Sequence, residues 1–423
     1  MATGRRRTCV IIGGGFGGLS AAKRLRNSNV DVILIDKTNH YLFQPLLYQV
    51  ATAALSPGDV AQPIRSILRR STNIHVLMQT VLHIDTTERL IVHDGGVISY
   101  DHLILAPGAR HSYFGHPEWE AAAPGLKDLN DALLIRERLL TTFEKAERDR
   151  DLTARRRALT FVIVGAGPTG VELAGAIAEI STKTMLPDFP ALRREDVRVL
   201  LVDAGPRVLT AFTEGLSAKA LASLQDLGVE VQLSTPVTDV RADGVQIGDE
   251  FIYSTNVIWA AGNQASPILR DLDVPLDRQG RVFVNDDCTI PGHDDVYVIG
   301  DAANLRDLPG VAQVAMQQGS YAATIIKDNV AAGSRKPFRY RDLGSMATIG
   351  RARAVAQVFG LSFSGFLAWA LWAAIHIASL IGFRNRFKVM IEWLWFYMSF
   401  QPGARLIVHR EIVTNERPSE QQA

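Results

Sequence analysis

Short apolar runs that end in glycine occur in the same order twice along the chain. The stretch "TCVIIGGGFGGLSAAKRLRNSNVDVILID" (8–36) predicts a buried strand, a glycine turn, a helix and a second buried strand. The stretch "LTFVIVGAGPTGVELAGAIAEI" (159–180), followed by "VRVLLVDA" (197–204), predicts the same elements. Runs of Val, Ile and Phe are typical of parallel strands that are buried on both faces. The pattern therefore indicates two βαβ units and an α/β fold.

Three further apolar runs predict strands that complete these units. Two of them, 102–110 and 256–264, contain a glycine close after the strand, and "DDVYVIGDAAN" (294–304) carries Gly-Asp. The charged stretch 128–158 predicts a surface helix and a linker. We expect one nucleotide-binding domain to be interrupted by a second. The expected division is a first domain at 1–118 and 285–340, a second at 119–284, and a C-terminal region at 341–423.

The C-terminal region differs in character from the rest of the chain. Residues 361–382 contain no Asp, Glu, Lys or Arg, so the run is long enough to span a bilayer. Helical spacing would nevertheless gather polar and aromatic residues on one face, which favours contact with protein or with an interface. These residues are Ser362, Gly365, Trp369, Trp372, His376 and Ser379. We expect this region to lie on a membrane rather than to cross it.

Residues 389–400 are rich in aromatic side chains and too short to span a bilayer. Arg384, Arg386, Lys388 and Arg405 flank them. This combination is typical of an interfacial helix that lies among anionic headgroups.

Composition excludes several classes of protein. Charged residues make up 21% of the 423 residues and the net charge is +1, which does not suggest a nucleic-acid binder. The two cysteines, Cys9 and Cys288, exclude a disulfide framework, a CxxC dithiol and a cysteine-based metal site. They fit a reducing compartment, and we interpret both as packing residues. The basic N-terminus lacks the long apolar core of a secretory signal, and we expect no metal.

The first glycine loop, Gly13-Gly14-Gly15-Phe16-Gly17-Gly18, has the G-x-G-x-x-G spacing of a dinucleotide site. In that motif one glycine makes a tight turn, one lets the backbone approach a pyrophosphate, and one lets the helix pack on the strand. The phosphate then lies at the helix N-terminus. Asp36 ends the second strand, where a ribose-binding carboxylate is expected.

The second loop, Gly165-Ala166-Gly167-Pro168-Thr169-Gly170, is followed by Asp203 at the end of the next strand. Two dinucleotide sites in one chain imply two cofactors that exchange a hydride, and FAD in the first with a nicotinamide nucleotide in the second is the economical interpretation. Asp203 should accept hydrogen bonds from both ribose hydroxyls and repel a 2′-phosphate, which favours NADH over NADPH. Arg207 lies nearby in sequence and leaves this preference open.

Several stretches resemble a known family. The layout with "VYVIGDAAN" resembles the flavoprotein reductases with two dinucleotide-binding domains. Within that group, four segments closely resemble the type II NADH:quinone oxidoreductases, single-subunit respiratory dehydrogenases that do not pump protons. The segments are "NHYLFQPLLYQVATAALSPGDVAQPIR" (39–65), "GPTGVELAGAIAE" (167–179), "AQVAMQQG" (312–319) and "FRNRFKVMIEWLWFYMSFQPGARLI". Pro402 departs from the basic residue that many members carry.

The resemblance implies roles for individual residues. Asp301 would hold the ribityl chain of FAD, Glu172 would lie near the nicotinamide, and Gln313 and Gln317 would line the quinone side of the flavin ring. Simpler alternatives are that Glu172 serves the helix dipole and that Asp301 caps the following helix. The expected cofactor-binding residues are Gly13, Gly14, Gly15, Phe16, Gly17, Gly18, Asp36, Lys37, Asn39, His40, Gln44, Val81, Ala106, Gly108, Gly165, Gly167, Pro168, Thr169, Gly170, Glu172, Asp203, Gly262, Asp301, Ala312 and Gln313, and the expected quinone-binding residues are Gln44, Pro45, Gln313 and Gln317.

Neutral amides suit a quinone site. Pro309-Gly310 precedes the octet "AQVAMQQG", so we expect a helix to begin there and to direct its N–H groups at an anionic reduced flavin. Gln313 and Gln317 share a helical face. An amide can donate to a quinone carbonyl and later accept from the quinol hydroxyl without adding charge. Two solvated glutamines on a surface helix are the alternative.

The sequence thus predicts an FAD-dependent NADH dehydrogenase that reduces ubiquinone or menaquinone. The resemblance also implies a homodimer, attached monotopically to the cytoplasmic side of the cell inner membrane. Disulfide reductases and sulfide:quinone reductases need cysteines that are missing here. A reductase for a soluble acceptor of the ferredoxin type, and a membrane-docked NADH sensor with structural FAD, are the alternatives.

Overall fold

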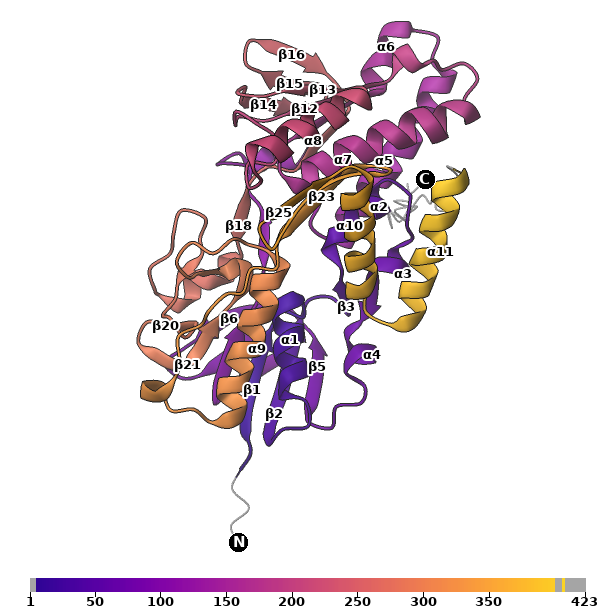
Figure 1. The fold of residues 1–423 in the computed structure, drawn as a ribbon. Helices are drawn as coiled ribbons and strands as arrows, with labels where there is room; N and C mark the ends of the chain where they lie inside the picture. Colours follow the sequence, from indigo (N-terminus) through magenta and orange to yellow (C-terminus); the bar gives the residue numbers. More distant parts are fainter. Residues whose placement is uncertain (1–4, 400–404, 408–423) are drawn as a thin grey trace, which may run out of the picture.

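The computed structural model describes residues 5–399 and 405–407. It is an α/β fold of two stacked units, with the C-terminal region along one side of both (Figure 1). The first unit lies at the bottom of this view and the second at the top. Pro402 and the end of the aromatic stretch, residue 400, lie outside the described residues.

The first unit is built on a six-stranded sheet with the order β20-β21-β9-β1-β2-β5. Five strands are parallel and β20 is antiparallel. Alternate side chains of β1 enter different cores, with Cys9 and Ile11 on one face and Val10 and Ile12 on the other. The bounds are β1 (Arg7–Ile12), β2 (Val30–Asp36), β5 (Ile74–Met78), β9 (His102–Leu105), β20 (Thr289–Ile290) and β21 (His293–Val298).

Two helices, α1 (Phe16–Leu25) and α9 (Ala312–Asp328), lie side by side against this sheet (Figure 1). A side chain at Gly319 would collide with the Gly17 carbonyl, so glycine permits their close approach. Smaller elements complete the unit: β3 (His40–Leu42), α2 (Leu47–Ala51), α3 (Pro57–Val60), β4 (Ala61–Pro63), α4 (Ile64–Leu68), β6 (Val81–Asp85), β7 (Leu90–His93), β8 (Gly96–Ser99), β19 (Val282–Phe283) and β22 (Ala303–Asn304).

The second unit has a parallel sheet with the order β13-β12-β11-β17 and a separate antiparallel sheet of β14, β15 and β16. The bounds of its strands are β11 (Thr160–Val164), β12 (Arg198–Val202), β13 (Val229–Gln232), β14 (Val237–Arg241), β15 (Gly244–Ile247), β16 (Glu250–Tyr253) and β17 (Asn256–Trp259). Its main helices are α5 (Leu129–Arg148), α6 (Leu152–Ala158), α7 (Pro168–Glu179) and α8 (Glu214–Asp226).

The expected surface helix and linker at 128–158 is only partly correct. The stretch forms two helices, and α5 buries one face that includes Leu139 and Phe143. The high charge of the exposed face concealed this amphipathic pattern, which makes α5 part of the core rather than a surface connection.

The chain crosses between the units at β10 (Ala109–His111) and β18 (Asn263–Ala265), which pair antiparallel. After β18, Leu269, Leu272 and Val282 pack in the same core as Val10 of β1. The chain therefore returns to the first unit before residue 285, which is the boundary expected from the sequence.

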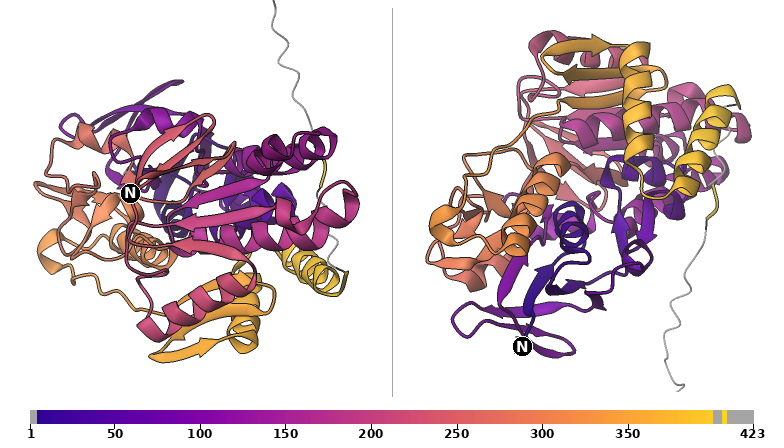
Figure 2. Two further views of the ribbon diagram at one scale, coloured as in Figure 1. Left: turned by 90° about the horizontal axis from the view of Figure 1, so that it is seen from above. Right: turned by 60° about the horizontal axis from the view of Figure 1, so that its bottom comes forward.

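The C-terminal region forms a sheet of three strands and two helices beside the second unit (Figure 2). These are β23 (Ser345–Gly350), β24 (Arg353–Val358), β25 (Leu361–Ser364), α10 (Phe366–Ser379) and α11 (Phe383–Ser399). The prediction of one helical face over 361–382 was wrong at its start, because residues 361–364 pair with β24 and Gly365 turns the chain with a φ of +74°. Among the described residues, none of the helices is both long and apolar enough to traverse a bilayer.

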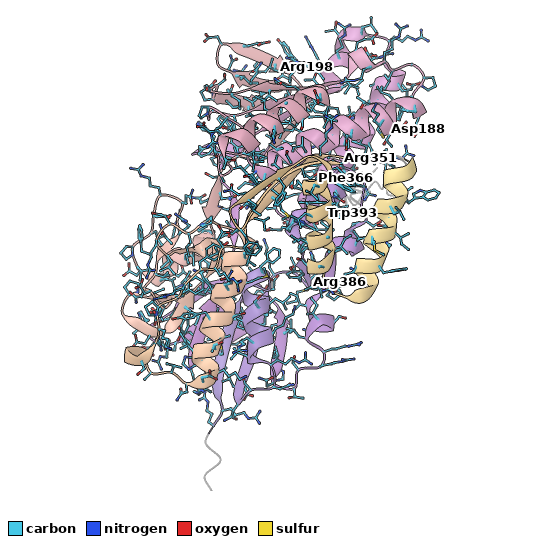
Figure 3. All side chains as sticks on the ribbon, in the orientation of Figure 1. Asp188, Arg198, Arg351, Phe366, Arg386 and Trp393 are labelled. Carbon is cyan, nitrogen blue, oxygen red and sulfur yellow. The ribbon has the colours of Figure 1, made fainter. Side chains whose placement is uncertain are left out.

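Three ring side chains of α10 and α11, Trp372, His376 and Trp393, pack against one another and toward the first unit. Trp372 is buried and stacks on His376 and on Trp393 of α11. Figure 3 shows Trp393 between the two helices. The Trp393 indole donates a hydrogen bond of 2.8 Å to Gln49 of α2. Of the two alternatives, protein or interface, the contacts of Trp372 and His376 are with protein.

Two of the cations predicted to meet headgroups have partners inside the protein. Lys388 pairs with the buried Asp59 at 2.6 Å and with Glu392 at 3.3 Å. Arg405 pairs with Asp188. For these two side chains the headgroup prediction is corrected, because carboxylates of the same chain already neutralise their charge.

Candidate active site

The first glycine loop joins β1 to α1 and is fixed by hydrogen bonds to β2. Gly13 has a φ of +97° and donates to the Ile35 carbonyl at 2.8 Å. Gly14 donates to the Asp36 carboxylate at 2.6 Å, and a side chain at Gly18 would collide with the Gly13 carbonyl. A Cβ on Gly15 would meet nothing within 4 Å, so the backbone is open on the side where a pyrophosphate approaches such a loop.

The second loop repeats this geometry. Gly165 has a φ of +106° and donates to the Val202 carbonyl at 2.7 Å, and Ala166 donates to the Asp203 carboxylate at 2.5 Å. Gly170 again has no room for a side chain, and Gly167 is open. The nearby Arg207 donates to the carbonyls of Phe212 at 2.8 Å and Thr210 at 3.0 Å. The two loops therefore have equivalent geometry, each with one open glycine before the helix.

A cavity of about 540 Å³ opens between the two units. One wall comes from the start of α7 in the second unit, and the other from the segment before α9 in the first. Predicted residues that line it are Gln44, Gly167, Pro168, Thr169, Glu172, Gly262 and Asp301. The cavity thus brings residues of both predicted nucleotide sites together.

Glu172 lies on α7 at the edge of this cavity, and one of its oxygens is 3.5 Å from the Thr348 amide that donates to it. Burial raises the pKa of Glu172 to about 8. A carboxylate stabilised by the helix dipole would show the opposite shift. The neutral acid is therefore the form favoured at pH 7, which argues against a role in the dipole alone.

Asp301 also faces the cavity, and it does not cap the helix that follows. The N-cap of α9 is Val311, and no side chain accepts a hydrogen bond there. Pro309 and Gly310, just before this helix, line the cavity. The Asp301 carboxylate and the segment just before α9 thus lie at the same wall.

Comparisons with known proteins agree with this geometry. The model of the pyridine nucleotide-disulphide oxidoreductases matches residues 7–319, and that of the NDH2 C-terminal domain matches residues 343–399. The chain is 44% identical to the type II NADH:quinone oxidoreductase Ndh of Mycobacterium tuberculosis, over 98% of this chain and 93% of that protein. The chain belongs to the type II NADH:quinone oxidoreductases.

More distant relatives of this family, and solved structures, extend the likeness. A mitochondrial external alternative NADH-ubiquinone oxidoreductase of Yarrowia lipolytica is 29% identical, over 92% of this chain and 79% of that protein. The structure of NDH2 from Plasmodium falciparum in complex with NADH has a TM-score of 0.86 at 19% identity, and covers 96% of this chain and 100% of that chain. A sulfide:quinone oxidoreductase from Aquifex aeolicus shares the fold, with a TM-score of 0.72 at 16% identity over 95% of this chain and 96% of that chain.

The predicted glutamine pair of this type II oxidoreductase lies outside the lining of the cavity. Gln317 donates to the Arg341 carbonyl at 2.9 Å and accepts from the Arg341 amide at 3.0 Å. Gln313 donates to the Gly344 carbonyl at 3.4 Å. Both amides therefore hold the connector to the C-terminal sheet. The third glutamine, Gln318, is buried and accepts from Gly300 at 2.7 Å.

The remaining predicted residues belong to the first unit. Phe16 packs edge-on against Tyr41 and Phe43, and the Ala106 amide donates to Ile12 at 2.8 Å. His40 is on β3 next to Asn39, Val81 begins β6, and Ala312 begins α9. Lys37 is exposed, Pro45 lies beside Gln44, and Gly108 has a φ of +70°.

Several residues that line the cavity carried no sequence signal. Tyr48 comes from α2 within the segment of family resemblance, and its spacing alone marks it as core. Lys127 and His111 come from the crossings between the units, and Arg281 follows the second unit. Arg281 pairs with Asp277 at 2.6 Å. Only the pairing of distant segments brings these side chains together.

Proposed function

We propose that this chain passes a hydride from NADH to FAD and two electrons onward to a membrane quinone, without pumping protons. The observation that carries the proposal is the shared cavity, which Glu172 and the α7 N-terminus enter from one unit and Asp301 enters from the other. The close likeness to a type II NADH:quinone oxidoreductase over 98% of the chain supports it.

The first unit fits FAD. Gly15 leaves its loop open beside the start of α1, whose N–H groups can bind a pyrophosphate. Asp36 stands at the end of β2, where it can accept from the adenosine ribose. Asp301 would hold the ribityl chain, and the uncapped start of α9 would face the flavin ring.

The second unit fits NADH. Gly167 leaves the loop open at the start of α7, and the Asp203 carboxylate lies at the end of β12 where a ribose is expected. Two carbonyls of its own segment accept hydrogen bonds from the Arg207 guanidinium, while the Asp203 carboxylate carries the charge that would repel a 2′-phosphate. These contacts favour NADH over NADPH.

FAD, when bound, accepts the hydride from NADH and supplies two electrons to the quinone. The protein's residues position the two partners and handle the proton. The cavity between the units orients the nicotinamide, while the start of α9 stabilises negative charge beside it. Glu172 is protonated at pH 7 because burial raises its pKa to about 8, so it can donate a proton to a quinone oxygen.

The acceptor is a quinone rather than a protein dithiol. Cys9 and Cys288 are both buried and form no disulfide. Each packs in the hydrophobic core of the first unit and does not line the cavity. Gln44 and Pro45 lie beside the cavity and would contact the quinone, with Gln313 and Gln317 at the connector. Ubiquinone and menaquinone both fit this chemistry.

The exposed face of α11 supports attachment to an anionic membrane surface. Five large apolar side chains are exposed at the spacing of one helical stripe: Phe387, Met390, Ile391, Leu394 and Trp395. The exposed Arg386 lies on the same helix (Figure 3). We infer monotopic attachment at the cytoplasmic side of the cell inner membrane, with a homodimer as the assembled form.

Stopped-flow mixing with NADH tests the function. The purified protein should be yellow, its absorbance near 450 nm should bleach on mixing, and a short-chain quinone should restore it. A flavin that does not bleach would indicate the sensor alternative. A flavin that bleaches but reoxidises only with a ferredoxin-type acceptor would indicate the soluble-acceptor alternative.

A further inference from the structure

The turn between Asp301 and α9 holds two consecutive residues in the left-handed conformation. Arg306 has a φ of +53° and Asp307 has a φ of +55°. Residues other than glycine adopt this conformation only at a cost in free energy, and they keep it where surrounding contacts hold them there. Residues 308–310, which come directly afterwards, line the cavity. The strained turn therefore lies beside the wall of the candidate active site.

A buried amide, Asn304 of β22, holds this turn from one side. Its side-chain oxygen accepts a hydrogen bond of 3.1 Å from the Asp307 backbone amide. Its side-chain nitrogen donates to the carboxylates of Asp277 at 3.0 Å and of Asp307 at 3.1 Å. Because the oxygen and both hydrogens have partners, the contacts fix the orientation of the Asn304 amide.

Arg281 holds the same turn from the other side. Its mostly buried guanidinium pairs with Asp277 at 2.6 Å. It also donates to the Asp307 carboxylate and to the Leu308 carbonyl, each at 3.4 Å. Asp277 thus accepts hydrogen bonds from both Arg281 and Asn304. We call Asn304, Arg281 and Asp277 the turn clamp, because together they hold Asp307 and the start of the cavity wall.

The wall that follows the turn lies against the Asp301 carboxylate. A Cβ on Gly310 would be 3.2 Å from one oxygen of Asp301, so the backbone of the wall approaches this side chain closely. Asp301 and Gly310 both line the cavity. A displacement of the wall would therefore change the position available to the Asp301 carboxylate and the approach to the start of α9.

We propose that Asn304 and Arg281 are positioning residues of the flavin site. They hold the turn in its left-handed conformation and thereby fix the wall at 308–310 and the Asp301 carboxylate. The inference rests on the proposed function, in which Asp301 and the start of α9 face FAD. The alternative is that the turn clamp stabilises the fold alone, in which case its loss would lower stability without changing the properties of the bound flavin.

The test compares the Asn304→Ala and wild-type holoenzymes at a temperature at which both are folded. FAD should dissociate from the variant about tenfold faster or more on dilution, since the turn loses a side chain bonded to two carboxylates. The fluorescence of the released flavin measures this rate. The midpoint potential of the bound flavin should become more negative, because the displaced wall and α9 stabilise the reduced ring less well.

Arg281→Lys is a second variant that decides the same question if Asn304→Ala does not fold. It keeps the positive charge beside Asp277 but removes the planar fork that reaches Asp307 and Leu308. FAD dissociation and midpoint potential should change in the same directions as in Asn304→Ala, by smaller amounts.

Asn73 offers a matched control away from the cavity. It is also a buried amide, and its oxygen accepts at 2.8 Å from the backbone of Asn27, which has a φ of +56°. Its nitrogen donates to the carbonyls of Leu25 at 2.9 Å and Val30 at 2.7 Å. Asn73→Ala should lower the Tm as Asn304→Ala does. It should leave FAD dissociation and the midpoint potential at their wild-type values.

Adding Arg306→Gly to Asn304→Ala tests the role of the strained conformation. Glycine adopts a positive φ without steric cost, so the double variant should release FAD more slowly than Asn304→Ala alone. The ion pair that Arg306 forms with Asp286 is exposed on both sides, so its loss should matter little.

Three results would overturn the inference. They are wild-type flavin properties in Asn304→Ala, equal changes in Asn304→Ala and Asn73→Ala, and a double variant that releases FAD as fast as Asn304→Ala. A wild type that binds FAD but that no quinone reoxidises would instead refute the proposed function, and the comparison of FAD dissociation would still hold.

Discussion

Glu172 is the residue whose environment most directly predicts a pH dependence. Because burial raises its pKa to about 8, its proton is present below that pH and lost above it. Quinone reoxidation of the NADH-reduced protein should therefore fall as pH rises through about 8, while bleaching by NADH should not. Glu172→Gln should reoxidise slowly at every pH. A wild-type profile that is flat between pH 7 and 9 would contradict this assignment.

The same shift makes a prediction for stability. The pKa of Glu172 is higher in the folded than in the unfolded chain, so the folded chain holds this proton more tightly. Its contribution is present below the unfolded pKa, near 4.3, and is lost as pH rises through about 8. The Tm of the wild type should therefore decline relative to that of Glu172→Gln between pH 5 and 9. A constant difference in Tm would show that the carboxyl is not buried as described.

Asp203 and Asp36 offer a matched pair, because each accepts a hydrogen bond from the second residue of its own glycine loop. Replacing Asp203 with Asn removes the charge that repels a 2′-phosphate and keeps the side-chain size. Loss of one charged hydrogen bond to the ribose should raise KM for NADH about tenfold or more. The ratio of kcat/KM for NADH to kcat/KM for NADPH should therefore decrease. Asp36→Asn should weaken FAD retention and leave that preference unchanged. Equal effects of both substitutions on the preference would show that Asp203 is only structural.

At this scale the sequence was sufficient to predict the geometry of the glycine loops but not the contacts of the glutamines. The roles of Gly13, Gly18, Gly165 and Gly170 follow from steric limits that any such strand–turn–helix imposes, so the pattern was sufficient. The partners of Gln313 and Gln317 lie in a connector more than twenty residues away. Spacing placed the two side chains on one face but carried no information about what covers that face.

The contact between α7 and β23 is the element-scale feature on which the site depends most. Adding a methyl group in Gly175→Ala would drive a Cβ into the Ile349 carbonyl, which can move only by separating the strand from the helix. We expect a loss of about 1–3 kcal/mol of stability, measured by thermal or urea unfolding. The substitution should also slow quinone reoxidation, because Thr348 would withdraw from Glu172.

Gly215→Ala is the control for this substitution. Gly215 lies in the first turn of α8, and a Cβ there would meet nothing within 4 Å. Alanine favours a helix over glycine by up to about 1 kcal/mol, so this variant should be as stable as the wild type or slightly more stable. An equal loss in both variants would mean that the helix–strand contact at Gly175 is not tight.

Element limits in the C-terminal region could not be obtained from hydropathy. Residues 361–364 carry the same uncharged pattern as the helix that follows, and they become a strand only because β24 offers a free edge. The helix then begins after Gly365, whose positive φ separates the two elements. The length of the uncharged run therefore overestimated the length of the helix, because α10 covers only Phe366–Ser379.

Across the whole molecule, the C-terminal helices are bound to the first unit by contacts distant in sequence. Lys388 pairs with Asp59, a side chain only 1% exposed, and Trp393 binds Gln49. The Arg405 side chain then reaches Asp188 of the second unit. Periodicity predicted a face suited to protein or to an interface, but it could not identify these partners, which depend on tertiary folding. Removing residues 361–423 would leave Gln49 and the buried Asp59 without these partners, so truncation also disturbs the first unit and is a poor test of membrane binding.

Substitutions on the exposed stripe of α11 give a cleaner test of how the molecule meets a membrane. Leu394 is 61% exposed and Phe387 is 52% exposed, so replacing both with Ser removes apolar area without opening the core. Each such side chain contributes about 1–2 kcal/mol when buried in an apolar phase, so binding to anionic vesicles should weaken at least tenfold. The double variant should keep its NADH-dependent bleaching.

Met78→Ser with Leu82→Ser is the control for this variant. It removes two side chains on β5 and β6 that are each 58% exposed, and it should bind vesicles like the wild type. Equal binding of all three proteins in a flotation assay would exclude α11 as the contact surface, whereas equal loss in both double variants would indicate nonspecific apolar adsorption.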